Sequence, residues 1–138
     1  MGGIMATKKI CKVLVVEDDS GIRELLSDVF ETEGYHFILA ANAAEMRAAL
    51  ARDFEIDILI VDVRLPDGED GLVLAREASS RGLPVILTSG DSAQLGTIAT
   101  SGHRHIAKPF RISSLLTLID ETLLATKANC ERELRAAG

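Results

Sequence analysis

Acidic side chains directly follow two apolar runs of this sequence. Glu17 and Asp18 come after Val13–Val16, and Asp62 comes after Ile58–Val61. Runs of four aliphatic residues are typical of strands that are buried on both faces, as in a parallel sheet. A lone aspartate at the end of such a strand is more often part of a turn than a reactive group. The interpretation of Asp62 therefore depends on which other side chains lie near it.

A hydroxyl group and an ammonium group occupy equivalent positions later in the chain. Thr88 follows the apolar run Val85–Leu87, and Lys108 follows His105–Ala107. In an open parallel α/β sheet the carboxyl ends of the strands lie along one edge, which is where ligands bind. We therefore expect these two side chains to converge with the three carboxylates at one site.

The charges expected at this edge indicate phosphoryl chemistry. Neighbouring carboxylates repel one another, so their pKa values rise unless a cation neutralises them. Mg²⁺ takes one or two carboxylates as ligands and completes its shell with water and phosphate. The metal and Lys108 would neutralise a phosphoryl group, and Thr88 would donate a hydrogen bond to it. The carboxylate of Asp62 can attack phosphorus and form an aspartyl phosphate.

Length and charge limit the class of protein. The chain has 138 residues, enough for one domain, and a net charge of −6, which argues against direct contact with nucleic acid or an anionic membrane. Its apolar runs are shorter than the ~18 residues of a membrane span, and residues 1–9 lack the apolar core of a secretory signal. Cys11 and Cys130 lack metal-ligand spacing. We therefore expect a cytoplasmic protein with reduced thiols.

The pattern of apolar residues alternates between strands and helices. Strands are expected at 13–16, 37–40, 58–61, 85–87 and 105–107, and helices at 20–33, 42–52, 71–80, 93–101 and 112–128. Ser20 and Asn42 are predicted to cap the first two helices. This alternation predicts an α/β fold, in which helices cover both faces of a parallel sheet. Residues 1–9 are expected to be a flexible N-terminal tail, and residues 129–138 a C-terminal tail.

Four short segments together resemble the receiver domain of two-component response regulators, over about residues 10–127. They are VVEDDS (15–20), LIVDVRLP (59–66), ILTSG (86–90) and AKPF (107–110). The resemblance implies a flavodoxin-like, doubly wound sheet of five parallel strands in the order 2-1-3-4-5, within a single receiver domain at 1–138. It also implies that Asp62 receives a phosphoryl group from a histidine kinase or a histidine phosphotransfer protein.

The resemblance implies two sets of ligands at the edge of the sheet. Mg²⁺ would be held by carboxylates and one backbone carbonyl that follow the first and third strands, namely those of Glu17, Asp18, Asp62 and Arg64. The phosphoryl oxygens would be held by residues at the ends of the fourth and fifth strands, namely Thr88, Ser89 and Lys108.

A switch that reports phosphorylation is also implied. Thr88 would move toward the phosphoryl group, and His105, at a position where the family most often has Tyr or Phe, would move inward. The face formed by the fourth helix, fifth strand and fifth helix would then change its binding to partners, including a phosphorylation-dependent homodimer. Lys108–Pro109 is expected to be cis, because Lys108 must point into the site while Phe110 turns the chain toward the last helix, and members of the family usually meet this need with a cis bond.

The function expected first is a signalling domain that catalyses only its own phosphorylation and dephosphorylation and has no output domain of its own. Three other functions are considered beside it. A phosphohydrolase with an aspartyl nucleophile often has a second Asp two residues on, where this chain has Arg64. A flavin- or nucleotide-binding module needs a Gly/Ser/Thr-rich loop after the first strand, where this chain has acids. A degenerate receiver that serves as an adaptor is disfavoured by the complete acidic set.

Overall fold

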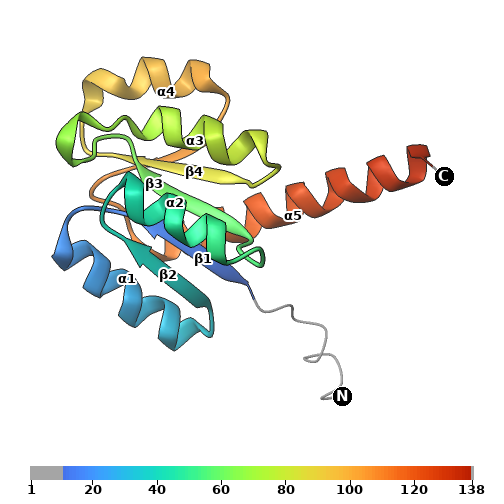
Figure 1. The fold of residues 1–138 in the computed structure, drawn as a ribbon, viewed down its shortest axis with the longest axis horizontal. Coiled ribbons are helices and arrows are strands. Elements are labelled where there is room, and N and C mark those ends of the chain that lie inside the picture. The colour runs from blue at the N-terminus through green and yellow to red at the C-terminus, as the bar shows by residue number, and fades with distance from the viewer. Residues whose placement is uncertain (1–10, 138) are drawn as a thin grey trace.

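The computed structural model describes residues 11–137, in which strands and α-helices alternate (Figure 1). The strands are β1 (Lys12–Val16), β2 (His36–Ala40), β3 (Ile58–Asp62), β4 (Val85–Ser89) and β5 (Arg104–Ala107). The helices are α1 (Ser20–Glu33), α2 (Ala43–Arg52), α3 (Gly71–Ser80), α4 (Leu95–Ser101) and α5 (Ile112–Ala137), with two 3-10 turns, η2 (Pro66–Gly68) and η3 (Ser92–Gln94). The expected N-terminal tail lies outside the described residues.

The strands form one parallel sheet in the order β2-β1-β3-β4-β5. This order confirms the doubly wound α/β fold. The register aligns the carboxyl ends of the strands: Asp62, the last residue of β3, lies directly opposite Thr88 in β4. The carboxyl ends of the strands therefore lie along one edge of the sheet, as the sequence predicted.

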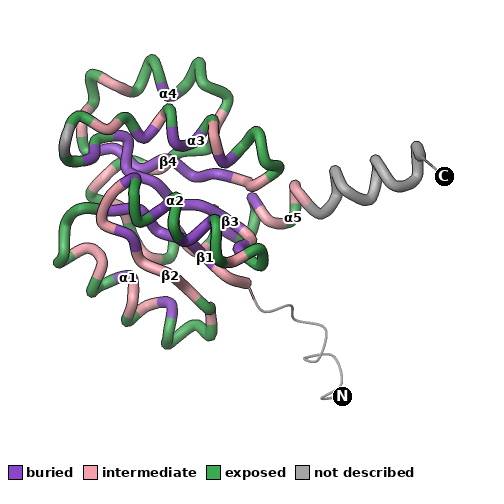
Figure 2. The backbone as a smooth tube through the Cα atoms, in the orientation of Figure 1, coloured by how far each residue is buried: buried purple, intermediate pink, exposed green. Residues whose placement is uncertain are grey.

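Helices cover both faces of the sheet, which explains why its central strands are apolar throughout. One apolar cluster lies between the sheet and α2, α3 and α4, and a second lies between the sheet and α1 and α5. All five residues of β3 are buried, with Leu59 and Val61 in the first cluster and Ile58 and Ile60 in the second (Figure 2). The run of aliphatic residues before Asp62 is thus buried on both faces.

The cap of α1 differs from the prediction. Asp19, not Ser20, is the N-cap: its backbone is extended and its Oδ1 accepts a hydrogen bond from the Ile22 N–H at 3.0 Å. Both residue types cap helices well, so the path of the chain after β1 decides which of them does so. Asn42 caps α2 as predicted, with its Oδ1 2.9 Å from the Glu45 nitrogen.

The last two helices also differ in extent from the prediction. The segment expected as one helix at 93–101 begins with η3, and α4 starts at Leu95. By contrast, α5 continues to Ala137, through most of the expected C-terminal tail. Residues of high helix propensity such as Ala, Glu and Arg allow a helix to continue beyond the residues that apolar spacing identifies. None of the helices within the described residues is both long and apolar enough to cross a membrane.

Candidate functional site

Asp62 occupies a fixed position at the end of β3. Its side chain is buried, and its two oxygens accept hydrogen bonds from different parts of the chain. Oδ1 lies 3.1 Å from the Arg64 backbone nitrogen, and Oδ2 lies 2.7 Å from Lys108 Nζ. A carboxylate that is buried and bonded to a distant lysine does not act merely as a turn residue. Forming a turn is therefore not the only role of Asp62.

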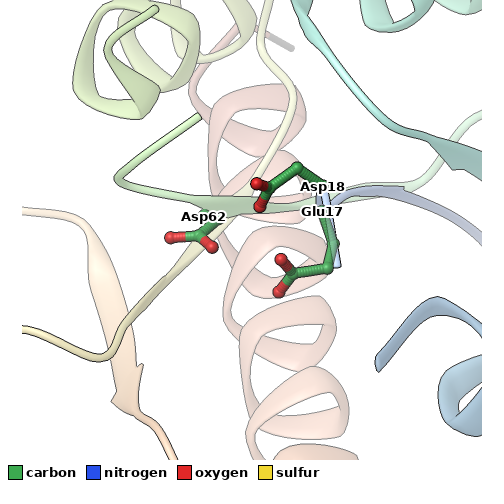
Figure 3. Close-up of side chains that lie close together, drawn as sticks. All are labelled: Glu17, Asp18 and Asp62. Atoms are coloured by element: carbon green, nitrogen blue, oxygen red, sulfur yellow. The ribbon is translucent and has the colours of Figure 1, made fainter. Parts of the chain in front are cut away.

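Two further carboxylates reach toward Asp62 from the end of β1 (Figure 3). Glu17, Asp18 and Asp62 each offer one oxygen, and these oxygens all lie within 4.8 Å of one another. Glu17 is buried and its Oε2 accepts a hydrogen bond from the Asp19 N–H at 3.2 Å, whereas Asp18 is exposed. The structure therefore brings together the three acidic residues that the sequence singled out.

Lys108 carries its ammonium group from the end of β5 into this cluster. Nζ lies 2.5 Å from Glu17 Oε1 and 2.7 Å from Asp62 Oδ2. The backbone N–H of Lys108 donates to the Ser89 carbonyl at 2.8 Å, which ties the end of β5 to the end of β4. The peptide bond between Lys108 and Pro109 is cis, as predicted. Convergence of the lysine with the carboxylates is thus confirmed.

The environment shifts the protonation of this cluster. Burial raises the pKa of Glu17 above its usual value, although the hydrogen bond from Lys108 partly opposes this effect. Burial by itself lowers the pKa of Lys108, but the hydrogen bonds with Asp62 and Glu17 outweigh it and raise the pKa above its usual value. Lys108 is therefore a permanent cation at neutral pH. Burial, by contrast, disfavours the ionised form of Glu17.

The oxygen donors of this site have the chemistry of a divalent cation site. Carboxylates from Glu17, Asp18 and Asp62 are hard ligands, and Asp18 is exposed to solvent, so that water can complete a coordination shell. Lys108 neutralises part of the negative charge on Glu17 and Asp62, but within the described residues it forms no ion pair with Asp18. The residues present therefore fit a small, hard cation such as Mg²⁺.

The hydroxyl residues lie at the end of β4, beside Asp62. Thr88 and Ser89 are both buried, and the Val63 N–H donates to the Thr88 carbonyl at 2.9 Å. The Ser89 Oγ bonds to both the backbone nitrogen and the backbone carbonyl of Asp91, each at 3.2 Å. These contacts hold the start of the loop after β4 against the site.

His105 lies apart from these residues. It is exposed on β5 and lines an open pocket of about 400 Å³ between β5 and α5, with Ser113, Thr117 and Glu121 among its neighbours. In the register of the sheet it is opposite Leu87, one residue before Thr88. The structure thus places His105 on the face formed with α5, one strand position away from the buried site.

Two residues that shape the site were not singled out by the sequence. A Cβ atom on Gly71 would lie only 2.0 Å from the Asp62 carbonyl oxygen, so α3 can start here only with glycine. Asp91 pairs with Arg64 across the loops that follow β3 and β4. A glycine at a helix start and an Asp before a helix are visible in sequence, but their tertiary contacts are not.

Comparisons with known proteins agree with this geometry. Residues 13–120 match the response regulator receiver domain, and the chain therefore belongs to this family of two-component signalling domains. It is 32% identical over 121 residues to the aerobic respiration control protein ArcA of Escherichia coli, which covers 85% of this chain and 50% of ArcA. The chain spans half or less of the length of the first curated relatives that it matches.

Solved structures show the same fold. A CheY-like response regulator receiver domain protein from Methanospirillum hungatei has a TM-score of 0.78 at 27% identity, covering 88% of this chain and 99% of its own. The response regulator protein TrrA from Thermotoga maritima, solved in complex with Mg²⁺ and BeF, has a TM-score of 0.72 at 26% identity. That match covers 82% of this chain and 99% of TrrA.

Proposed function

We propose that Asp62 accepts a phosphoryl group from the phosphohistidine of a histidine kinase or a histidine phosphotransfer protein, in a reaction that depends on Mg²⁺. The observation that carries this proposal is the buried Asp62 carboxylate, which has an ammonium group at 2.7 Å and two further carboxylates close by. Membership of the receiver family supports the same assignment.

The reaction is a displacement at phosphorus. An oxygen of Asp62 attacks the phosphoryl group, a P–O bond forms, and the P–N bond to the donor's imidazole breaks, with its electron pair returning to the ring nitrogen. Lys108 remains beside the attacking carboxylate and neutralises the charge that accumulates on the phosphoryl oxygens. Thr88 and Ser89, at the end of the adjacent strand, supply hydroxyl groups for the same oxygens.

The metal-binding residues in this proposal are the carboxylates of Glu17, Asp18 and Asp62 together with the backbone carbonyl of Arg64. Mg²⁺, when bound, supplies positive charge to the phosphoryl oxygens. Asp18 contributes an exposed oxygen, whereas Glu17 is buried and bonded to Lys108, so Glu17 is better placed to act through water. The complex of TrrA with Mg²⁺ and BeF supports this assignment by analogy.

The proposed output is a change in partner binding on the face formed by α4, β5 and α5. Thr88 would respond to the phosphoryl group, and the exposed His105 would alter this face, including any phosphorylation-dependent homodimer. The proposal places the domain in the cytoplasm, with a kinase or phosphotransfer protein as donor and without direct contact with nucleic acid or membrane. The net charge of −6 is consistent with protein partners.

Phosphorylation of Asp62 is tested with a small phosphodonor. The protein is incubated with acetyl phosphate or phosphoramidate, with Mg²⁺ or with EDTA, and its intact mass is followed. We expect one phosphoryl group to be gained with Mg²⁺ only. Asp62→Asn is expected to abolish the gain, whereas Asp28→Asn, which changes an exposed carboxylate on α1, leaves it unchanged. A phosphoryl group that still appears on the Asp62→Asn protein would exclude this assignment.

The output proposal has a separate test. After phosphodonor treatment, His105→Ala is compared with the wild type by intact mass and by sedimentation, at about pH 6 and about pH 8. We expect weaker phosphorylation-dependent association in the variant when the two proteins carry equal amounts of phosphoryl group. Equal association at both pH values would make His105 an ordinary surface residue.

A further inference from the structure

Asp18 differs from the other two carboxylates of the site in how its side chain is held. Lys108 pairs with both Asp62 and Glu17. The side chain of Asp18 is exposed, and the hydrogen bonds and ion pairs within the described residues do not include its carboxylate. The carboxylate nevertheless lies close to those of Glu17 and Asp62 (Figure 3). The backbone on either side of Asp18 therefore sets the direction of its side chain.

Arg23 holds the backbone on both sides of Asp18. Its Nη1 donates to the Glu17 carbonyl oxygen at 2.8 Å, and its backbone N–H donates to the Asp19 carbonyl oxygen at 3.0 Å. The first bond fixes the peptide group that joins Glu17 to Asp18, and the second belongs to the first turn of α1, whose N-cap is Asp19. One residue of α1 thus anchors the short segment that carries Asp18.

The sheet leaves the Glu17 carbonyl without a backbone donor. The Glu17 N–H extends the ladder between β1 and β2 by donating to the Ala40 carbonyl oxygen at 2.9 Å. In a regular parallel ladder the Glu17 carbonyl would next accept from the Asn42 N–H. Asn42 instead caps α2, and within the described residues no such bond forms. Arg23 therefore supplies the donor that the diverging backbone does not.

The guanidinium of Arg23 makes this bond although carboxylates lie nearby. Arg23 is half-buried in a groove between α1 and β2 that Glu24 and Asp28 also line. It forms no ion pair with either of them in the part of the chain that the structure describes. A hydrogen bond from a charged donor is about twice as strong as one between neutral groups. The guanidinium is thus bonded to the backbone of the acidic loop rather than to the neighbouring surface charges.

We propose that Arg23 is a positioning residue for metal binding, which holds the peptide between Glu17 and Asp18 so that the Asp18 carboxylate stays beside that of Asp62. The inference rests on the proposed binding of Mg²⁺ by these carboxylates. In this role Arg23 contacts neither the cation nor the phosphoryl group. Without its bond the peptide group can rotate, and Asp18 loses its preset direction. Groups that orient metal ligands in this way contribute a factor of about 10–100 to metal affinity.

The first test measures Mg²⁺ affinity in the absence of any phosphodonor. Wild type, Arg23→Ala and Arg23→Lys are freed of metal with EDTA, dialysed and titrated with Mg²⁺, and binding is followed by the amide NMR signals of residues 17–19 and of Asp62. The signals of the rest of the domain show that each variant is folded. We expect the Kd of Arg23→Ala to be about tenfold above that of wild type. Arg23→Lys keeps one charged donor on a shorter side chain, so its Kd should fall between the two.

The sign of the change separates positioning from charge. Arg23→Ala removes a positive charge next to an acidic loop, which by electrostatics alone would raise the affinity for a cation. Loss of position lowers the affinity instead. Arg47→Ala is the matched control, because it removes a positive charge from α2, where Arg47 is paired with Glu77 at 2.7 Å. The Kd of this control should stay within about twofold of wild type.

The rate of phosphorylation provides a second readout. With phosphoramidate as donor, the Mg²⁺ concentration that gives half the maximal rate should rise about tenfold in Arg23→Ala. The rate at saturating Mg²⁺ should approach that of wild type, because Asp62 and Lys108 keep their bond in the variant. A general loss of structure would instead lower the rate at every Mg²⁺ concentration.

Several outcomes would overturn the inference alone, while wild type still binds Mg²⁺ and gains a phosphoryl group. They are a Kd of Arg23→Ala equal to or below that of wild type, an Arg23→Lys protein that binds no better than Arg23→Ala, and a maximal rate that saturating Mg²⁺ does not restore. An Arg47→Ala protein as impaired as Arg23→Ala would also do so. Wild type that binds no Mg²⁺ would overturn the assignment of the metal site, and this inference with it.

Discussion

The carboxyl end of β3 and the segment from α4 to β5 differ in how many of their residues are buried. Every residue of β3 is buried, and α3, which follows it, buries four of its ten residues. In β5 no residue is fully buried, and α4 buries one of its seven, Ile98 (Figure 2). Elements with few buried contacts open at lower free energy than the core of the same domain.

This difference suits the two tasks of a receiver domain. A site that aligns Asp62, Glu17 and Lys108 within hydrogen-bond distance needs rigid supports, and the central strands supply them. The partner-binding change proposed for the face of α4, β5 and α5 would need two arrangements of similar free energy, which a short, weakly packed helix beside an edge strand would supply at low cost. Four predictions break or sharpen this comparison, beginning with the largest expected effect.

Two glycines offer the first test, one in each region. Gly71→Ala places a Cβ 2.0 Å from the Asp62 carbonyl oxygen, a backbone atom that cannot yield, and should lower the free energy of unfolding by about 3 kcal/mol. Gly96 in α4 has open space around its Cβ position, so Gly96→Ala should raise the free energy by about 0.5–1 kcal/mol. Denaturant titration measures both, and equal effects would show that the regions are packed alike.

The second test removes the buried anchor of α4. Ile98→Ala should lower the free energy of unfolding by about 2 kcal/mol and speed hydrogen exchange of the α4 amides at least about tenfold, because the helix has no other buried side chain. Leu74→Ala in α3 is the matched control, and there we expect faster exchange throughout the sheet. If Ile98→Ala accelerates β3 amides as much as those of α4, the two regions unfold as one unit.

The third test concerns the cost of ionising Glu17. Since its pKa in the folded protein lies above the usual 4.5, the folded state binds a proton more tightly, and stability is lost as the pH rises above that value. Glu17→Gln should therefore raise the free energy of unfolding at neutral pH by about 1 kcal/mol in EDTA, and the difference should shrink toward acid pH.

We expect addition of Mg²⁺ to reverse the order of stability of wild type and Glu17→Gln. Metal that binds the folded state stabilises the wild type by mass action, and Glu17→Gln should gain less because the variant has lost one carboxylate. Thermal unfolding at about pH 5 and about pH 7 with EDTA or Mg²⁺ measures both effects. A Glu17→Gln protein that is less stable than wild type in EDTA at neutral pH would contradict the pKa direction.

The smallest effect is expected at His103, between α4 and β5. Burial, and after it the charge of Arg76, lowers the pKa of His103 below its usual 6.5. Stability is therefore full above pH 6.5 and declines as the pH falls below it, because the unfolded state binds the proton first. The decline should be less than about 0.5 kcal/mol and should disappear in His103→Gln. Arg76→Ala should reduce this loss of stability at acid pH. If the loss is unchanged in His103→Gln, another group is responsible for it.

The sequence by itself determined the sheet and the convergence of charges on Asp62. A strand buried on both faces must be apolar throughout, so the strand before Asp62 could be predicted from its run of aliphatic residues. Strands of a parallel sheet all point the same way, so their carboxyl ends share one edge, and the strand order implied by the family resemblance brings Lys108 after β5 near Glu17 after β1. Such predictions succeed because they depend on periodicity and direction, which are local properties of the chain.

Only the tertiary structure decided which neighbouring groups meet. Asp19 caps α1 although Ser20 is also a good cap, since the backbone after β1 presents Asp19 to the free N–H groups. Arg64 meets Asp91 because two loops, 27 residues apart, run side by side beyond the strands. Periodicity identifies the residues that are buried, but the tip of an exposed side chain is placed by loop path and rotamer, and neither follows from local spacing.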